Sequence, residues 1–196
     1  MEEFEFWGAR GGVEACVPWR FTVAIGWLAF APGLAAGNTV VLKPAEITPL
    51  TEIRLDELAL DAGIPEHVFQ VLPGKGSIVG QCLVDHPDVA KIVFTGSTEV
   101  GRQVMIGCAA RIKPVTLELG GKSANVVFAD ADLEAAAASA PYAVFDNAGQ
   151  DCCARSRILV QRRAYGRFME LFETAVKAVV VTDPSDRTPE RVPLAR

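Results

Sequence analysis

The sequence has little of what marks a nucleic-acid-binding protein, a metalloprotein or a secreted protein. Its net charge is −5, and no cluster of Lys and Arg forms a face that could bind phosphates. It has two histidines, His67 and His86, neither with a metal partner nearby in the sequence, so we expect surface roles and no metal site. The N-terminal stretch MEEFEFWGAR is acidic where a signal peptide would be basic. These absences favour small-molecule partners and a cytoplasmic location.

The cysteines lack the spacing of a disulfide framework or a zinc site. There are five, an odd number, with no CxxC motif and no Cys/His pattern. We predict that Cys16, Cys82 and Cys108 are small buried residues. The adjacent pair Cys152-Cys153 requires a different explanation.

Charge is absent from one long segment, Phe21 to Leu42, which is long enough to span a bilayer of about 30 Å. Pro32-Gly33 and Gly37-Asn38 interrupt this segment. We therefore interpret its first part as a buried helix that stops at glycine, and 38–42 as a buried strand. No membrane span is expected.

The rest of the chain alternates between short apolar runs and helical patterns. Apolar runs without polar alternation are typical of parallel strands that are covered on both faces. We expect such strands at 38–42, 68–72, 91–95, 115–119, 125–128 and 157–161. We expect one helix at 48–63, a short helix that ends near residue 84, a helix that ends near residue 110, one at 132–145 and a long one that ends near residue 181. Residues 182–196 are expected to form a loop. The pattern predicts an α/β fold with a doubly wound parallel sheet.

Several residues lie where such a sheet binds its ligand, beyond the carboxyl ends of its strands. Gly96 and Gly101 in FTGSTEVG fall between a strand and a helix, where backbone N–H groups can face a phosphate, although two glycines also suit a simple tight turn. Lys43 and Glu46 in KPAE could hold a ribose, or could be ordinary solvated loop residues. GGKS at 120–123 is not a phosphate loop, because the required first glycine is replaced by Thr116.

The motif NAGQDCC, at 147–153, places two adjacent cysteines in a glycine-containing turn. A loop exposes a thiol better than a core does, so one of the two could be a catalytic nucleophile. Adjacent cysteines do not easily form a disulfide with each other. The second thiol could simply be packed.

Five segments in order resemble the aldehyde dehydrogenase superfamily: PWRF (18–21), LAAGNTVVLKPAE (34–46), FTGSTEVGR (94–102), LELGGKS (117–123) and GQDCC (149–153). The resemblance implies a Rossmann-like coenzyme domain and an NAD cofactor, with NADP not excluded. It implies that Cys152 attacks an aldehyde to form a thiohemiacetal, and that Glu118 activates the water that hydrolyses the resulting thioester. It also implies cofactor contacts for Trp19, Lys43, Glu46, Gly96, Ser97 and Gly101.

Two departures from the family pattern qualify this expectation. The family usually has asparagine after Pro-Trp, where its amide helps to hold the oxyanion, but this chain has Arg20. The chain is also shorter than family members, which are homo-oligomers, and it lacks their oligomerisation arm. We expect 1–120 to be a partial coenzyme-binding domain and 121–196 the start of a catalytic domain, in a truncated chain that is inactive by itself.

Two alternatives to this function remain. One is a catalytically dead relative that serves as a binding or interaction module. The other is an acylating enzyme that passes the thioester to coenzyme A, which the base at Glu118 disfavours.

Overall fold

A computed structural model describes residues 9–182 and 191–193 of the chain, which divides into two units, Met1–Leu119 and Gly120–Arg196. The division falls beside the boundary expected from the sequence. The coenzyme-binding and catalytic roles of the two parts stay predictions. Each unit is described by itself.

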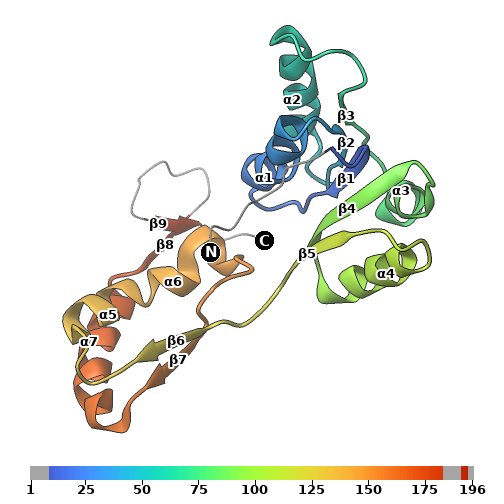
Figure 1. Ribbon diagram of the computed structural model, residues 1–196. Coiled ribbons are helices and arrows are strands. Elements are labelled where there is room, and N and C mark those ends of the chain that lie inside the picture. Colours follow the sequence, from blue (N-terminus) through green and yellow to red (C-terminus); the bar gives the residue numbers. More distant parts are fainter. Residues whose placement is uncertain (1–8, 183–190, 194–196) are drawn as a thin grey trace, which may run out of the picture. The chain divides into compact units, whose positions relative to one another are not determined.

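The first unit is built on five parallel strands, which lie in the order β3-β2-β1-β4-β5 (Figure 1). The strands are β1 (Gly12–Cys16), β2 (Thr39–Lys43), β3 (Phe69–Val71), β4 (Val89–Gly96) and β5 (Val115–Leu119). The chain adds β2 and β3 on one side of β1 and then crosses over to place β4 on the other side. The strand order therefore reverses beside β1, and ligand crevices form at such a reversal.

The central strand β1 was absent from the sequence-based prediction. Its sequence, GVEAC, begins with glycine and carries a glutamate, so it lacks the apolar run that marked the other strands. Only pairing with two neighbours at once makes this segment a buried strand.

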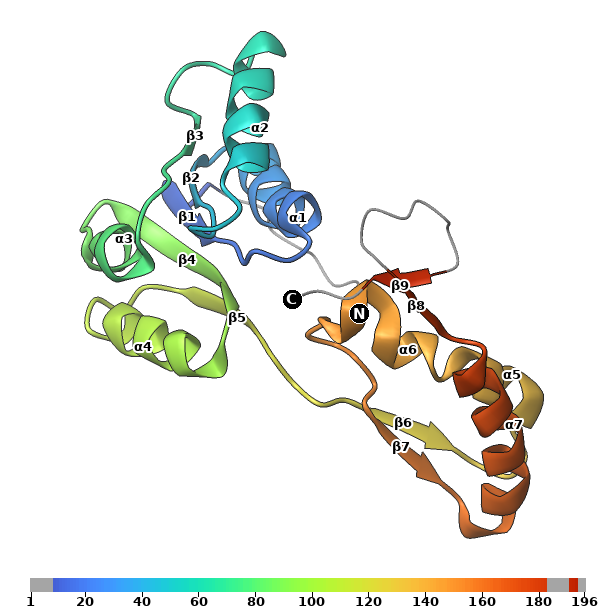
Figure 2. The ribbon, with the colours of Figure 1, turned by 180° about the vertical axis from the view of Figure 1, so that it is seen from behind.

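Helices cover both faces of the sheet, as predicted. Figures 1 and 2 show α1 (Thr22–Ala35) and α2 (Leu50–Asp61) on one face, with α3 (Gln81–Asp85) and α4 (Thr98–Ala109) on the other. A short π-helical turn, Gly76–Gly80, precedes α3. The core on the α1 side contains Val13, Val17, Phe30, Val40, Leu42 and Phe69, and the core on the α3 side contains Leu83, Val84, Val89, Ile92, Phe94, Val104 and Cys108. The doubly wound α/β prediction is confirmed.

The uncharged segment forms α1 and β2, but the prediction of a fully buried helix is wrong. Phe30 is buried and packs on Phe69, with 4.7 Å between the ring centroids. Leu28, on the other side of the helix, is exposed, and so is Trp27, whose ring lies edge-on to Phe30 with 5.3 Å between the centroids. One face of α1 is enough to cover the sheet, and among the described residues of this unit the opposite face stays exposed. Among the described residues, no helix is long and apolar enough to cross a membrane.

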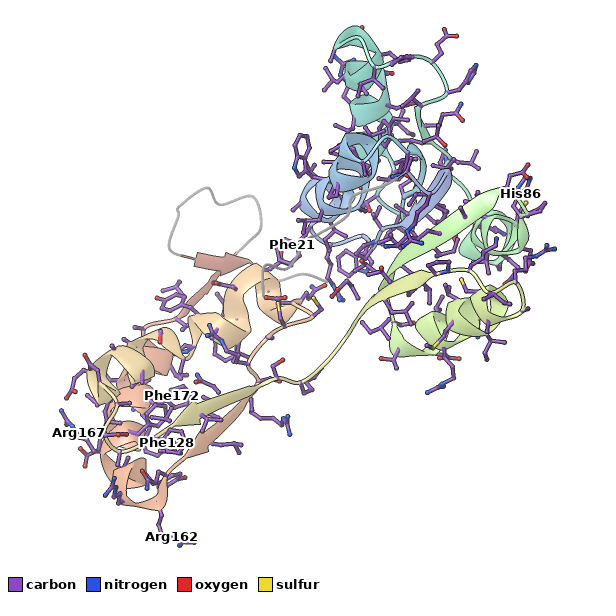
Figure 3. The ribbon with its side chains drawn as sticks, in the orientation of Figure 1. Phe21, His86, Phe128, Arg162, Arg167 and Phe172 are labelled. Carbon is purple, nitrogen blue, oxygen red and sulfur yellow. The ribbon has the colours of Figure 1, made fainter. Side chains whose placement is uncertain are left out.

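The second unit pairs two parallel strands, β6 (Ala124–Val127) and β7 (Arg157–Val160), beneath α5 (Leu133–Ser139) and α7 (Tyr165–Lys177). Val127, Ala137, Ala140 and Phe168 form its buried core. Arg167 of α7, labelled in Figure 3, donates to Glu134 of α5 at 2.8 Å across the two helices.

Three boundaries of the second unit differ from the prediction. The helix expected at 132–145 is divided into α5 and α6 (Tyr142–Phe145), because Pro141 has no N–H to continue the hydrogen-bonding of α5. The final helix ends at Lys177 and is followed by β8 (Val180–Thr182). The expected loop at 182–196 contains β9 (Arg191–Pro193), which pairs with β8, while 183–190 and 194–196 lie outside the described residues.

Candidate active site

A pocket of about 280 Å³ in the first unit lies beyond the carboxyl ends of β1, β2 and β4. Its walls come from these strand ends, from the π-helical turn with α3, and from α4. The lining residues are Cys16, Val17, Lys43, Gly76, Ser77, Gly80, Gln81, Val84, Phe94, Thr95, Val100, Gln103 and Val104. The pocket therefore lies where the strand order reverses, the position at which open α/β sheets bind their ligands.

Two of the predicted cofactor residues border this pocket or its entrance. Lys43 is buried at the end of β2, and its Nζ donates to the carbonyl of Pro44 at 2.7 Å. Glu46 is exposed, and its Oε1 accepts from the backbone N–H of Gly76 at 2.8 Å. This bond joins the loop after β2 to the pocket wall formed after β3. Glu46 is thus fixed beside the pocket.

The passage from β4 into α4 contains Gly96, Ser97 and Gly101. Ser97 and Gly101 have different structural roles there. Ser97 caps α4, since its Oγ accepts from the N–H of Val100 at 3.3 Å. The first N–H groups of this 12-residue helix face outward at the carboxyl edge of the sheet, which suits an anion. Gly101 lies inside the helix, and a Cβ there would meet Leu119 Cδ2 at 2.5 Å. The close packing of α4 on β5 therefore explains why glycine occupies position 101.

Trp19 and Arg20 form one exposed feature just after β1. The guanidinium carbon of Arg20 lies 4.3 Å from the centroid of the Trp19 ring, a cation–π contact. Arg20 is therefore placed over its neighbour's ring, and its long side chain occupies space that a short amide would leave open.

The predicted nucleophile Cys152 is exposed in the second unit. The turn before it, Asp146–Gly149, has three consecutive residues with positive φ: Asn147 at 51°, Ala148 at 59° and Gly149 at 72°. This conformation is uncommon for alanine and is favoured by glycine. It is held by Asn147, whose Nδ2 donates to the carbonyl of Gln150 at 3.0 Å. Backbone strain of this kind is typical of turns that present functional groups.

The two adjacent thiols differ in their surroundings. Cys153 donates from both its backbone N and its Sγ to Asp151 Oδ1, each at 3.1 Å. The hydrogen bond to Asp151, together with desolvation, raises the pKa of Cys153 to about 11. The same hydrogen bond lowers the pKa of Asp151 below its usual range. Cys153 therefore stays a thiol at neutral pH, and a thiol is a far poorer nucleophile than a thiolate.

Sequence reasoning did not identify Asp151 or the polar residues Ser77, Gln81 and Gln103 of the pocket. Asp151 could have been noticed, because a carboxylate directly before two cysteines is positioned to bond one of them. The pocket residues carry no local signal. The prediction of buried cysteines is confirmed for Cys108 but is wrong for Cys82, which is exposed on the short helix α3.

Glu118, the predicted base, lies next to last in the edge strand β5 and is exposed. It is aligned with Thr95 of β4. Its carboxylate is exposed among the described residues of the first unit, so water or substrate can reach it there.

Comparison with known proteins identifies the family. The model of the aldehyde dehydrogenase family matches residues 2–196. The cytosolic 10-formyltetrahydrofolate dehydrogenase of Pongo abelii is 48% identical over 90% of this chain and 20% of its own length. The aldehyde dehydrogenase KauB from Pseudomonas aeruginosa has a TM-score of 0.89 at 47% identity, over 94% of this chain and 37% of KauB. PnpE in complex with nicotinamide adenine dinucleotide has a TM-score of 0.87 at 44% identity, over 94% of this chain and 38% of PnpE.

These matches agree with one another in sequence and in three-dimensional structure. The chain spans from 20% to 38% of the lengths of these proteins. The family model, in contrast, matches nearly the whole of this chain. The chain therefore belongs to the aldehyde dehydrogenase family.

Proposed function

We propose that this chain is the part of an aldehyde-oxidising enzyme that carries the nucleophile, the base and the adenosine end of the cofactor site. Cys152 attacks the aldehyde carbon through Sγ, forming a C–S bond and an oxyanion. After loss of hydride the carbon is a thioester on Cys152. Glu118 takes a proton from water, the hydroxide attacks the thioester carbon, and the C–S bond breaks to release the carboxylic acid and the thiolate.

The cofactor we propose is NAD, which accepts the hydride when bound. The pocket in the first unit supports this choice, because it joins an apolar hollow, a carboxylate and a helix N-terminus. Glu46 would hold ribose hydroxyls beside Lys43, Ser97 and Gly96 would approach the pyrophosphate, and Trp19 would line the cleft. A carboxylate at the ribose favours NAD over NADP, because it repels an added phosphate.

The observation that carries the proposal is the exposed Cys152 beside a second thiol that Asp151 keeps protonated. Brief treatment with iodoacetamide, followed by fragmentation of the labelled peptides, should find Cys152 modified faster than Cys153. Cys82 is the matched control, because it is an exposed cysteine outside the site. Faster modification of Cys16, Cys82, Cys108 or Cys153 would show that Cys152 is not the nucleophile.

Arg20 supports a second candidate, a catalytically dead relative that keeps the fold as a binding module. The family asparagine would donate to the oxyanion, whereas Arg20 lies over the ring of Trp19. Iodoacetamide separates the two candidates, because a dead site gives Cys152 no more reactivity than Cys82. In an intact homologue, arginine at this position should lower turnover by roughly 10²-fold, the effect of losing one oxyanion donor.

A further inference from the structure

The turn that carries Cys152 brings three metal-ligating side chains together. Asp151, Cys152 and Cys153 each offer one ligand atom, and these atoms all lie within 4.8 Å of one another. In tetrahedral zinc sites with Zn–S bonds of 2.3 Å, two sulfur ligands lie about 3.8 Å apart. Asp151 Oδ1 and Cys153 Sγ are already 3.1 Å apart. Small side-chain rotations therefore suffice to place all three atoms around one ion.

We propose that Asp151, Cys152 and Cys153 form a three-ligand site for a thiophilic divalent cation, with Zn²⁺ as the natural representative. Two thiolates and one carboxylate are donors that zinc prefers, whereas Mg²⁺ and Ca²⁺ prefer oxygen alone. The fourth position of the ion stays open to water. No residue outside the second unit is needed.

The backbone already holds these ligands close to their binding positions. Asp151 Oδ1 accepts from the backbone N–H of Cys153 at 3.1 Å, which fixes the carboxylate beside the second thiol. The carbonyl of Asp151 accepts from the N–H of Ala154, which is buried and anchors the end of the turn. Three consecutive residues therefore need little reordering to bind an ion, and the entropy lost on binding is small.

Binding replaces protons with the metal. Both thiols lose their protons, the cation forms two S–metal bonds and one O–metal bond, and two protons pass to the solvent. Because binding releases protons, affinity for the cation should rise as the pH increases. Mildly alkaline buffer therefore gives the most sensitive assay.

The consequence for catalysis rests on the proposed function, because it requires Cys152 to be the nucleophile. A cation on Cys152 Sγ uses the lone pair that would attack the aldehyde. The site would then make the enzyme reversibly sensitive to zinc, and a chelator would restore the free thiol. Binding itself does not depend on this role.

Titration of the reduced chain with Cd²⁺ tests binding directly, through the ultraviolet charge-transfer absorption of sulfur–cadmium bonds. One equivalent should bind, and Zn²⁺ should displace it. Cys152→Ser and Cys153→Ser should each weaken binding by roughly tenfold or more, and Asp151→Asn should weaken it less. Cys82→Ser is the matched control and should bind normally. Circular dichroism of each variant verifies that it folds.

The same site can be measured through protection of its thiols. Saturating Zn²⁺ should slow iodoacetamide modification of Cys152 and Cys153 but not of Cys82, and a chelator should reverse the effect. Unchanged Cd²⁺ binding in either serine variant of the pair, or equal protection of Cys82, would overturn the proposal. If Cys152 shows no selective reactivity but Cd²⁺ still binds, the metal site stands and the proposed nucleophile fails.

Discussion

Glu14 provides a sharp test of the fold, because it is a fully buried carboxylate in the central strand β1. Its side chain is 0% exposed and lies on the α3 face of the sheet, where its neighbours in register are Val41 and Ile92. Cys16 Sγ donates to its Oε1 at 2.7 Å, while no hydrogen bond from the described part of the chain reaches Oε2. Burial raises its pKa from 4.5 to about 7, although Cys16 and the charges of Lys43 and Lys113 oppose this.

The pKa of Glu14 makes stability depend on pH in a defined direction. Between about pH 4.5 and 7 the folded state keeps the proton that the unfolded state has lost, so the free energy of unfolding falls as the pH rises. At about 1.4 kcal/mol for each pH unit, the full loss is about 3 kcal/mol. The contribution is fully present below pH 4.5 and is gone above about pH 7.

Glu14→Gln should remove this dependence, because glutamine does not ionise. We expect the pH-dependent difference between the variant and the original chain to be absent near pH 4 and to reach about 3 kcal/mol in favour of the variant at pH 8. Urea unfolding followed by tryptophan fluorescence is a suitable assay, because Trp19 and Trp27 belong to the first unit. Glu66→Gln, at an exposed carboxylate of the same unit, is the control. Parallel pH curves for the original chain and Glu14→Gln would refute the reasoning.

Three further predictions concern packing and activity. Gly101→Ala should destabilise the first unit by about 1–3 kcal/mol in urea unfolding, because the added Cβ would lie 2.5 Å from Leu119 Cδ2. Leu119→Ala in the same chain should relieve part of this cost. An unchanged free energy of unfolding for Gly101→Ala would contradict the close packing. Phe168→Ala should cost about 3–5 kcal/mol by emptying the core of the second unit, measured there by hydrogen exchange, whereas exposed Tyr165→Ala should cost much less. The 196-residue chain, which covers 37% of KauB, should form no NADH from aldehydes above a Cys152→Ala control, and a clear Cys152-dependent rate would disprove this.

The sequence by itself determined the class of fold, most of its elements and the family. Apolar runs are a local signal, so β5 was predicted at its observed bounds and β2, β4 and β7 to within a few residues. The motifs around Glu118 and Cys152 are also local, because the residues that carry the resemblance are close together in the chain. Such features can be identified without knowledge of what packs against them.

The tertiary structure alone decided the place of β1, the burial of Glu14 and the walls of the pocket. A strand that begins with glycine and contains glutamate is recognised only when two other strands hydrogen-bond to it, and those partners lie 27 or more residues away in the chain. The unequal thiols of Cys152 and Cys153 also depend on a geometric detail, the direction of the Asp151 carboxylate. Strand order is set by contacts between segments far apart in the chain, and side-chain direction is set by the local conformation of a turn. For that physical reason neither can be predicted from the pattern of apolar residues along the sequence.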